Sequence, residues 1–228
     1  MRTTTVVKSL VGTAAVAVAL SSAAWSAVVG GDQEGTASVR ALTAAAGQGM
    51  HSDYEPLTSP ADAVDSADLI VQGTVVEIGD GIQVTYPDEA MTRREANAYA
   101  TFVVAVDKVL HGDAGRVTDG KVYLAVPKGS RATPDSLDAL NPQARVVAVL
   151  GDLTTWRPYP TATVVRPSAI PAGAALWGPY VDGMWMQGAQ DAEMLAIEAE
   201  HSELPPGWGG VRTLAELATA IEKAAGTR

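Results

Sequence analysis

The sequence predicts a mainly β protein: a small closed or half-closed β-barrel with flanking helices, with a β-sandwich as the alternative. Three observations favour this fold class. Short runs of strand composition recur at close spacing, turn residues are plentiful with 22 Gly and 13 Pro in 228 residues, and an amphipathic helix closes the chain. A chain of this length buries enough surface to be stable by packing alone.

Residues 1–26 are predicted to be a secretory signal peptide. Arg2 and Lys8 supply the positive charge, Leu10 begins an apolar run of small residues, and Ser26 offers a cleavage site. The run is short and rich in Ala, Gly and Ser for a membrane span, which needs about 20 apolar residues. An uncleaved N-terminal anchor is the alternative. The leader predicts an exported protein, extracellular or at the cell envelope, and export without cysteine is typical of a bacterial product.

The remaining chain is divided into two parts. Residues 27–56 are rich in Gly, Ala, Ser and Thr without a helical or strand period, which predicts a flexible spacer with ordered structure beginning near Leu57. Residues 57–228 are predicted to form the barrel domain, with a C-terminal hairpin and helix.

Helix signals lie at both ends of this domain. Ser59 and Pro60 are typical of a helix start, which predicts a short helix ending near Ala67. Thr213 and Glu216 form a capping box that starts a helix ending near Ala225. Helical composition also occurs over residues 190–201, and a helical turn is expected over 134–140.

The strands are expected in the segments between these helices. A glycine inside the first segment, Gly73, predicts a bulge or bend. The dipeptide Asp182-Gly183 predicts the turn of a hairpin. The segments are 69–78, 82–86, 99–110, 121–126, 145–150, 161–166 and the hairpin 176–186.

Four stretches together resemble the OB-like barrel domain of a group of bacterial secreted proteins, whose topology is similar to the TIMP and netrin modules. They are Ala67–Val75, Phe102–Asp113 with His111 where lysine is usual, the 181–183 turn and the helix start at 213–217. The resemblance implies the fold and brings no catalytic or ligand-binding residues. The animal modules depend on cysteines, and this chain has none, so their inhibitory activity is not transferred.

Composition excludes several functional classes. The net charge of −10, from 16 Lys and Arg against 26 Asp and Glu, opposes binding to nucleic acid. The absence of cysteine excludes disulfides, thiolate metal sites and a cysteine nucleophile. No phosphate-binding loop, nucleophile elbow or zinc-binding helix motif occurs, so no cofactor, metal or catalytic residue is assigned.

Aromatic residues in the last third of the chain are the candidate ligand contacts. Trp and Tyr combine apolar area with a polar group and suit recognition surfaces; the alternative is that they pack against the C-terminal helix. The candidates are Trp156, Trp177, Tyr180, Trp185 and Trp208.

The function expected is a non-enzymatic barrel module that binds a protein or peptide partner at the cell envelope. The alternative is a carbohydrate or cell-wall binding module, which needs two or more coplanar, exposed rings. A hydrolase is the weaker alternative and needs Ser or Asp beside His111 or His201. No stable membrane span is expected in the mature chain.

Overall fold

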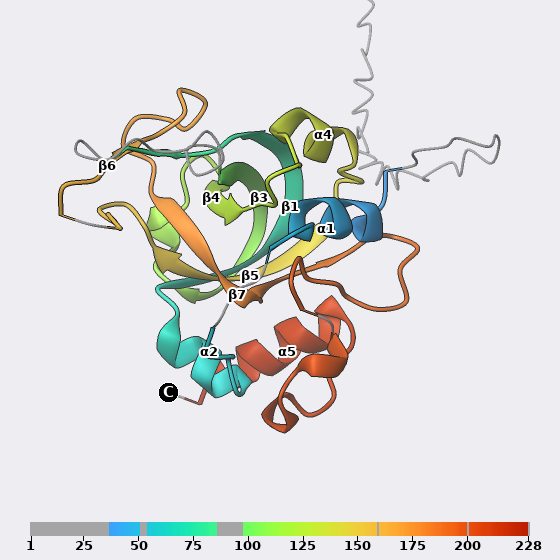
Figure 1. The fold of residues 1–228 in the computed structure, drawn as a ribbon. Helices are drawn as coiled ribbons and strands as arrows, with labels where there is room; N and C mark the ends of the chain where they lie inside the picture. The colour runs from blue at the N-terminus through green and yellow to red at the C-terminus, as the bar shows by residue number, and fades with distance from the viewer. Residues whose placement is uncertain (1–36, 51–53, 86–97, 159, 200, 228) are drawn as a thin grey trace, which may run out of the picture. The chain divides into compact units, whose positions relative to one another are not determined.

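The computed structural model describes residues 37–50, 54–85, 98–158, 160–199 and 201–227. Five strands form a closed barrel (Figure 1), which confirms the predicted fold class and is compatible with an OB-like barrel. The barrel strands are β1 (Leu69–Asp80), β3 (Tyr99–Gly112), β4 (Lys121–Pro127), β5 (Arg145–Asp152) and β7 (Leu176–Gln187). Their order is β1-β3-β4-β7-β5, and β5 pairs again with β1. Neighbours are antiparallel except for the parallel pair β4 and β7.

Strand β1 closes the barrel because it bends enough to pair on both edges. Its register with β3 shifts at three places, one of them between Gln72 and Gly73, which confirms the predicted irregularity at Gly73. An ideal Cβ at Gly73 would lie 2.1 Å from the carbonyl oxygen of Ala105, so only glycine permits this approach of the two strands.

Alternation along the strands divides the apolar residues between the barrel interior and its outer faces. On β3, Phe102 and Val104 belong to the interior cluster, whereas Val103 belongs to a cluster on the outside. On β7, Met184 and Met186 point inward and Trp185 points outward. Side chains therefore alternate between the two faces in both strands, as expected of a period-two strand.

Two helices cover the outer face of β1, β5 and β7. Helix α2 (Pro60–Ser66) begins at the Ser59 cap, and α5 (Leu214–Ala225) begins at the capping box of Thr213 and Glu216, as predicted. Figure 1 shows the two helices side by side against the barrel. The buried stripe of α5 meets Trp185 and Val147 in one apolar cluster, so the amphipathic face of the last helix is used for packing.

The outer face of β3 and β4 is covered by the chain's own connections. Strands β2 (Gln83–Thr85) and β6 (Thr163–Val165) pair with each other. Ile82 and Ile170 pack on Val103 and Tyr123 of the barrel. The prediction that 82–86 returns along the first strand is wrong in its partner, because the described residues 83–85 pair with β6.

The predicted hairpin at 176–186 is wrong. Strand β7 runs through Asp182-Gly183 and pairs with β5 in one direction on both sides of an irregularity, where Pro179 and Met184 face Leu150 and Ala148. The extra residues form a bulge instead of reversing the chain. The Asp182 carboxylate accepts a hydrogen bond from the Leu57 amide at 2.8 Å, which holds the bulge against the start of the domain.

The spacer prediction is wrong for part of its range. Helix α1 (Val39–Gly47) lies within 27–56, and its residues Val39, Leu42 and Ala46 belong to the interior cluster. Packing against the barrel and α4 (Pro134–Ala139) supplies the burial that a nine-residue helix needs. The predicted leader, 1–26, lies outside the described residues.

The helix expected over 190–201 is not formed. Within the described part of this segment, Leu195 makes an isolated bridge to Met186, and Met194 belongs to the cluster beneath α5. Pairing with the end of β7 outweighs helix propensity here. Three short 3-10 turns complete the described elements: Ala114–Arg116, His201–Glu203 and Pro206–Trp208.

Candidate functional site

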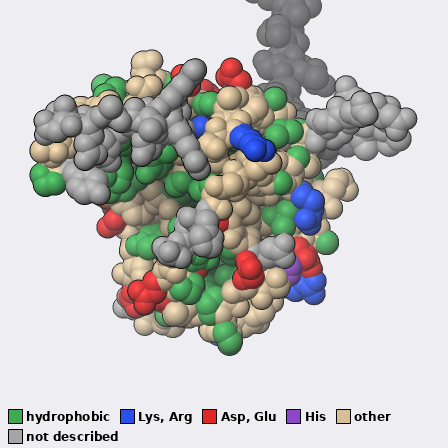
Figure 2. All heavy atoms as spheres, viewed as in Figure 1, with side chains coloured by type: hydrophobic (Ala, Val, Ile, Leu, Met, Phe, Trp, Pro, Cys, Tyr) green, Lys and Arg blue, Asp and Glu red, His purple; other side chains and the backbone are tan. Residues whose placement is uncertain are grey.

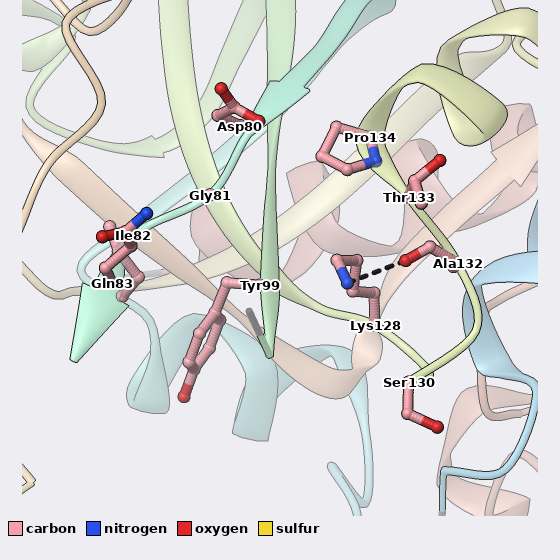
Figure 3. A pocket seen from close by; sticks show the side chains of 10 residues that line it. All are labelled: Asp80, Gly81, Ile82, Gln83, Tyr99, Lys128, Ser130, Ala132, Thr133 and Pro134. Atoms are coloured by element: carbon pink, nitrogen blue, oxygen red, sulfur yellow. Dashed lines mark hydrogen bonds between the residues drawn. The ribbon is translucent and has the colours of Figure 1, made fainter. Parts of the chain in front are cut away.

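The candidate site is a polar hollow of about 510 Å³ at the rim of the barrel (Figure 3). Its walls come from the end of β1 and the residues that follow it, the first residue of β3, and the connection between β4 and α4. The lining residues with a bearing on its chemistry and shape are Asp80, Gly81, Gln83, Tyr99, Lys128, Ser130 and Ala132. A hollow of this size lies within the range of small-molecule sites.

Lys128 gives the hollow its chemistry. The residue is 9% exposed and follows directly after β4. Its Nζ donates to the carbonyl oxygen of Ala132 at 2.8 Å. Among the described residues, no carboxylate lies within ion-pair distance of this ammonium. Burial lowers the pKa of Lys128, so the site holds a partly desolvated positive charge without an acidic partner.

Packing from distant segments fixes the loop that carries Lys128. The Lys128 amide donates to Ala98 at 2.9 Å, just before β3 begins. The Gly129 amide donates to Ala46 in α1 at 2.7 Å, and an ideal Cβ at Gly129 would lie 2.1 Å from the Gln48 oxygen. The segment predicted as a spacer therefore helps to hold the loop that carries Lys128.

The opposite wall is held at the junction of β1 and β3. The hydroxyl of Thr101 donates to the backbone oxygen of Asp80 at 2.7 Å. An ideal Cβ at Gly81 would lie 2.1 Å from the Tyr99 oxygen, so the chain passes Tyr99 closely only because residue 81 is glycine. The Tyr99 ring meets Trp156 edge-on, with centroids 6.5 Å apart.

This arrangement can bind an anion. An ammonium has three donors, and one of them is used by Ala132. Ser130 and Gln83 are exposed on the walls and add a hydroxyl and an amide. A ligand carboxylate at Nζ would make a charge-assisted hydrogen bond in a partly desolvated setting, where such bonds are strong.

Most of the aromatic candidates are structural. Trp177, Trp185 and Trp208 are at most 3% exposed, so the expectation that they offer faces to a ligand is corrected and they pack the core. Trp185 Nε1 donates to the Asp182 oxygen at 2.7 Å, and Trp208 Nε1 donates to the Leu57 oxygen at 2.7 Å. These bonds satisfy the polar atoms that burial would otherwise leave unpaired.

The other two aromatic candidates are half-buried. The Tyr180 hydroxyl donates to the Ser66 oxygen at 2.6 Å and so ties β7 to α2. Trp156 packs on Tyr99 with an interplanar angle of 68°. This pair is edge-on, whereas a sugar-binding platform needs coplanar rings. Arg116, at 4.3 Å from the Trp177 ring centroid, covers that indole as a cation–π contact.

The histidines do not form a catalytic group within the described structure. His201 Nε2 lies 3.4 Å from Glu193, which also pairs with Arg212, and its Nδ1 is buried without a hydrogen-bond partner. His111 lies on β3, and no hydroxyl or carboxylate bonds to it in the described part of the chain. Within the described residues, neither histidine forms a hydrogen bond with a serine or threonine hydroxyl, so the hydrolase arrangement is not found there.

Charges on the visible face are dispersed. Figure 2 shows Lys and Arg side chains separated from one another and interleaved with Asp and Glu, with no continuous basic stripe on this face. In the described ranges, no cluster of three or more His, Asp or Glu could hold a metal ion. No described helix is both long and apolar enough to cross a membrane.

Comparison with known proteins finds no matching family model, no matching curated protein and no matching solved structure.

Lys128 is a candidate site residue that the sequence alone does not predict. It lies in a segment, 128–142, with loop composition, and lysine in a loop is normally exposed. Its loop is held by backbone hydrogen bonds to Ala46 and Ala98, which are remote in sequence. The only local signal is its place directly after a strand, in the run Pro-Lys-Gly-Ser.

Lys128→Met is expected to raise the free energy of unfolding at pH 7 by about 1 kcal/mol, because it removes a desolvated charge and loses one hydrogen bond. The folded-state pKa of Lys128 is lowered, so the native protein binds fewer protons than the unfolded chain between that pKa and the usual 10.5. Wild-type stability therefore rises through this window, and the advantage of the variant shrinks. Urea unfolding at pH 7 and pH 10 measures both effects. If the stability difference between Lys128→Met and the wild type were larger at pH 10 than at pH 7, the lowered pKa of Lys128 would be contradicted.

Proposed function

We propose that this protein is a non-enzymatic, OB-like binding module that holds a protein or peptide ligand through an acidic group at Lys128. One observation carries the proposal: the Lys128 ammonium is buried beside a polar hollow, and no described carboxylate neutralises it. Such an unpaired charge destabilises a fold. Its presence in an open hollow is best explained by a ligand that supplies the negative charge.

The barrel supports the OB-like part of the proposal. If the five barrel strands are numbered by their order in the sequence, their order around the barrel is first, second, third, fifth, fourth. The third and fifth of them, β4 and β7, are parallel, and helix α4 lies between the third and fourth in the sequence. The sequence resemblance to secreted OB-like domains of TIMP and netrin topology agrees with this order. OB barrels bind ligands on the face of their second and third strands and the adjoining loops. Here that outer face is filled by Ile82 and Ile170, so the rim hollow is the accessible alternative.

Export and location at the cell envelope form part of the same proposal, because the leader at residues 1–26 supports them. N-terminal sequencing of the protein from the producing cells tests this part. A new N-terminus after Ser26 is expected, and a protein retained inside the cell with Met1 intact would contradict it.

Lys128 is tested with N-acetylated trialanine, which has only the C-terminal carboxylate, and with the same peptide amidated at its C-terminus. Titration followed by NMR should show the acid binding about tenfold more tightly than the amide, since hydrogen bonds between charged groups contribute roughly 1.5–3 kcal/mol. Lys128→Met and Lys128→Gln should remove this preference.

The matched control is Lys121→Met. Lys121 is an exposed lysine at the start of the same strand, β4, and its removal changes the net charge equally. This control should retain the preference for the acid. Equal binding of acid and amide to the wild-type protein, or an unchanged preference in both Lys128 variants, would overturn the proposal.

A further inference from the structure

We infer that the rim hollow takes a zwitterionic ligand, a short peptide with both termini free, with its carboxylate at Lys128 and its ammonium at Asp80. This inference rests on the proposed function and names the ligand class of the same site. The hollow contains a second charged group, the Asp80 carboxylate, which has no role in binding an anion.

Asp80 is the last residue of β1, and its exposed side chain lines the hollow. Figure 3 shows Asp80 and Lys128 on separate walls, one on the β1 side and the other on the β4–α4 connection. The two side chains do not pair with each other. In the described ranges, neither forms an ion pair with any other residue.

Both walls are held in place by the fold. The Asp80 backbone accepts from the Thr101 hydroxyl, and the neighbouring Gly81 passes tightly against Tyr99. Lys128 is fixed through Ala132. The backbone that carries Asp80 and the ammonium of Lys128 are therefore held in place before a ligand binds, which lowers the entropy lost on binding.

The pair of charges also selects against other anions. A carboxylate at Lys128 with an ammonium toward Asp80 satisfies both walls. A polyanion such as inorganic phosphate satisfies Lys128 and places negative charge near Asp80, which disfavours binding. The exposed Gln83 beside Asp80 can donate to and accept from a peptide group between the two ends.

The test uses trialanine in four forms: both termini free, N-acetylated, C-amidated and capped at both ends. For the wild-type protein, amidation should weaken binding about tenfold or more. Acetylation should weaken it about two- to fivefold, because Asp80 is exposed and such ion pairs are weak. Dialanine and tetraalanine establish which length spans the two walls.

Variants assign each effect to its wall. In Asp80→Asn, acetylation of the peptide should no longer weaken binding, whereas amidation still should. In Lys128→Met or Lys128→Gln, amidation should no longer weaken binding, whereas acetylation still should. Glu77→Gln, an exposed acid on the same strand outside the hollow, is the matched control and should keep both effects. Thermal melting of each variant shows whether it is folded.

The outcomes separate the two proposals. If amidation matters and depends on Lys128, but acetylation has no effect at any length, the proposed function stands and the zwitterion is wrong. The zwitterion is equally contradicted if inorganic phosphate competes as strongly as free trialanine. If neither capping changes binding, or no form binds, the proposed function fails and the inference fails with it.

Discussion

Gly73→Ala is expected to destabilise the protein by about 3 kcal/mol. The added Cβ would lie 2.1 Å from the Ala105 oxygen and 2.8 Å from Val104 Cγ1. The nearer atom belongs to the backbone of a paired strand, so the clash is relieved only by separating β1 from β3. Overpacking that shifts a backbone typically costs about 1–3 kcal/mol and occasionally more. Urea unfolding followed by circular dichroism measures the change.

The same strand provides the control. An ideal Cβ at Gly79 has Glu77 Oε1, at 3.9 Å, as its nearest neighbour. Gly79→Ala should therefore change stability little, or raise it slightly by reducing the entropy of the unfolded chain. Equal losses in the two variants would show that β1 does not depend on the close approach at Gly73.

Trp185→Ala is expected to cost about 3–5 kcal/mol, the usual range for removing a buried large aromatic side chain. The indole is 1% exposed and lies between β7 and the helices α2 and α5. Its Nε1 also donates to the Asp182 oxygen in the bulge of β7. Total stability of a domain is commonly about 5–15 kcal/mol, so this variant should retain little margin. Hydrogen exchange should increase first in α5.

Trp156→Ala is the comparison for this variant. Trp156 is half-buried and contacts Tyr99 by its edge, so its loss should cost clearly less, about 1–2 kcal/mol. A loss at Trp185 no larger than that at Trp156 would show that the helices do not depend on this indole for packing.

Local signals in the sequence were reliable where the structure uses them locally. Ser59 and Thr213 cap α2 and α5 because a cap is a contact within one helical turn. Phe102 and Val103 lie on opposite faces of β3 because side-chain direction alternates along a strand. Aspartate and glycine at 182–183 suggested a turn, but their actual role follows from distant Leu57.

The candidate site could not be found in this way. The loop that carries Lys128 is held by backbone hydrogen bonds to Ala46 and Ala98, which are remote in sequence, and burial lowers the pKa of its ammonium. The aromatic candidates had the composition of a binding surface, but Trp177 and Trp185 fill the two sides of β7. Composition does not distinguish these uses, because an indole buries apolar area equally well in a core or at an interface.

The β class, the capped helices, the bend at Gly73 and the acidic, cysteine-free composition can all be inferred from the amino-acid sequence. Each of these follows from contacts within a few residues or from residue type. The strand order, the burial of α1, the continuation of β7 through its bulge and the position of Lys128 opposite Asp80 follow from the tertiary fold. These features depend on pairing between segments that are remote in sequence. A local pattern shows that a strand or helix has an apolar face, but it does not specify which distant segment will cover that face.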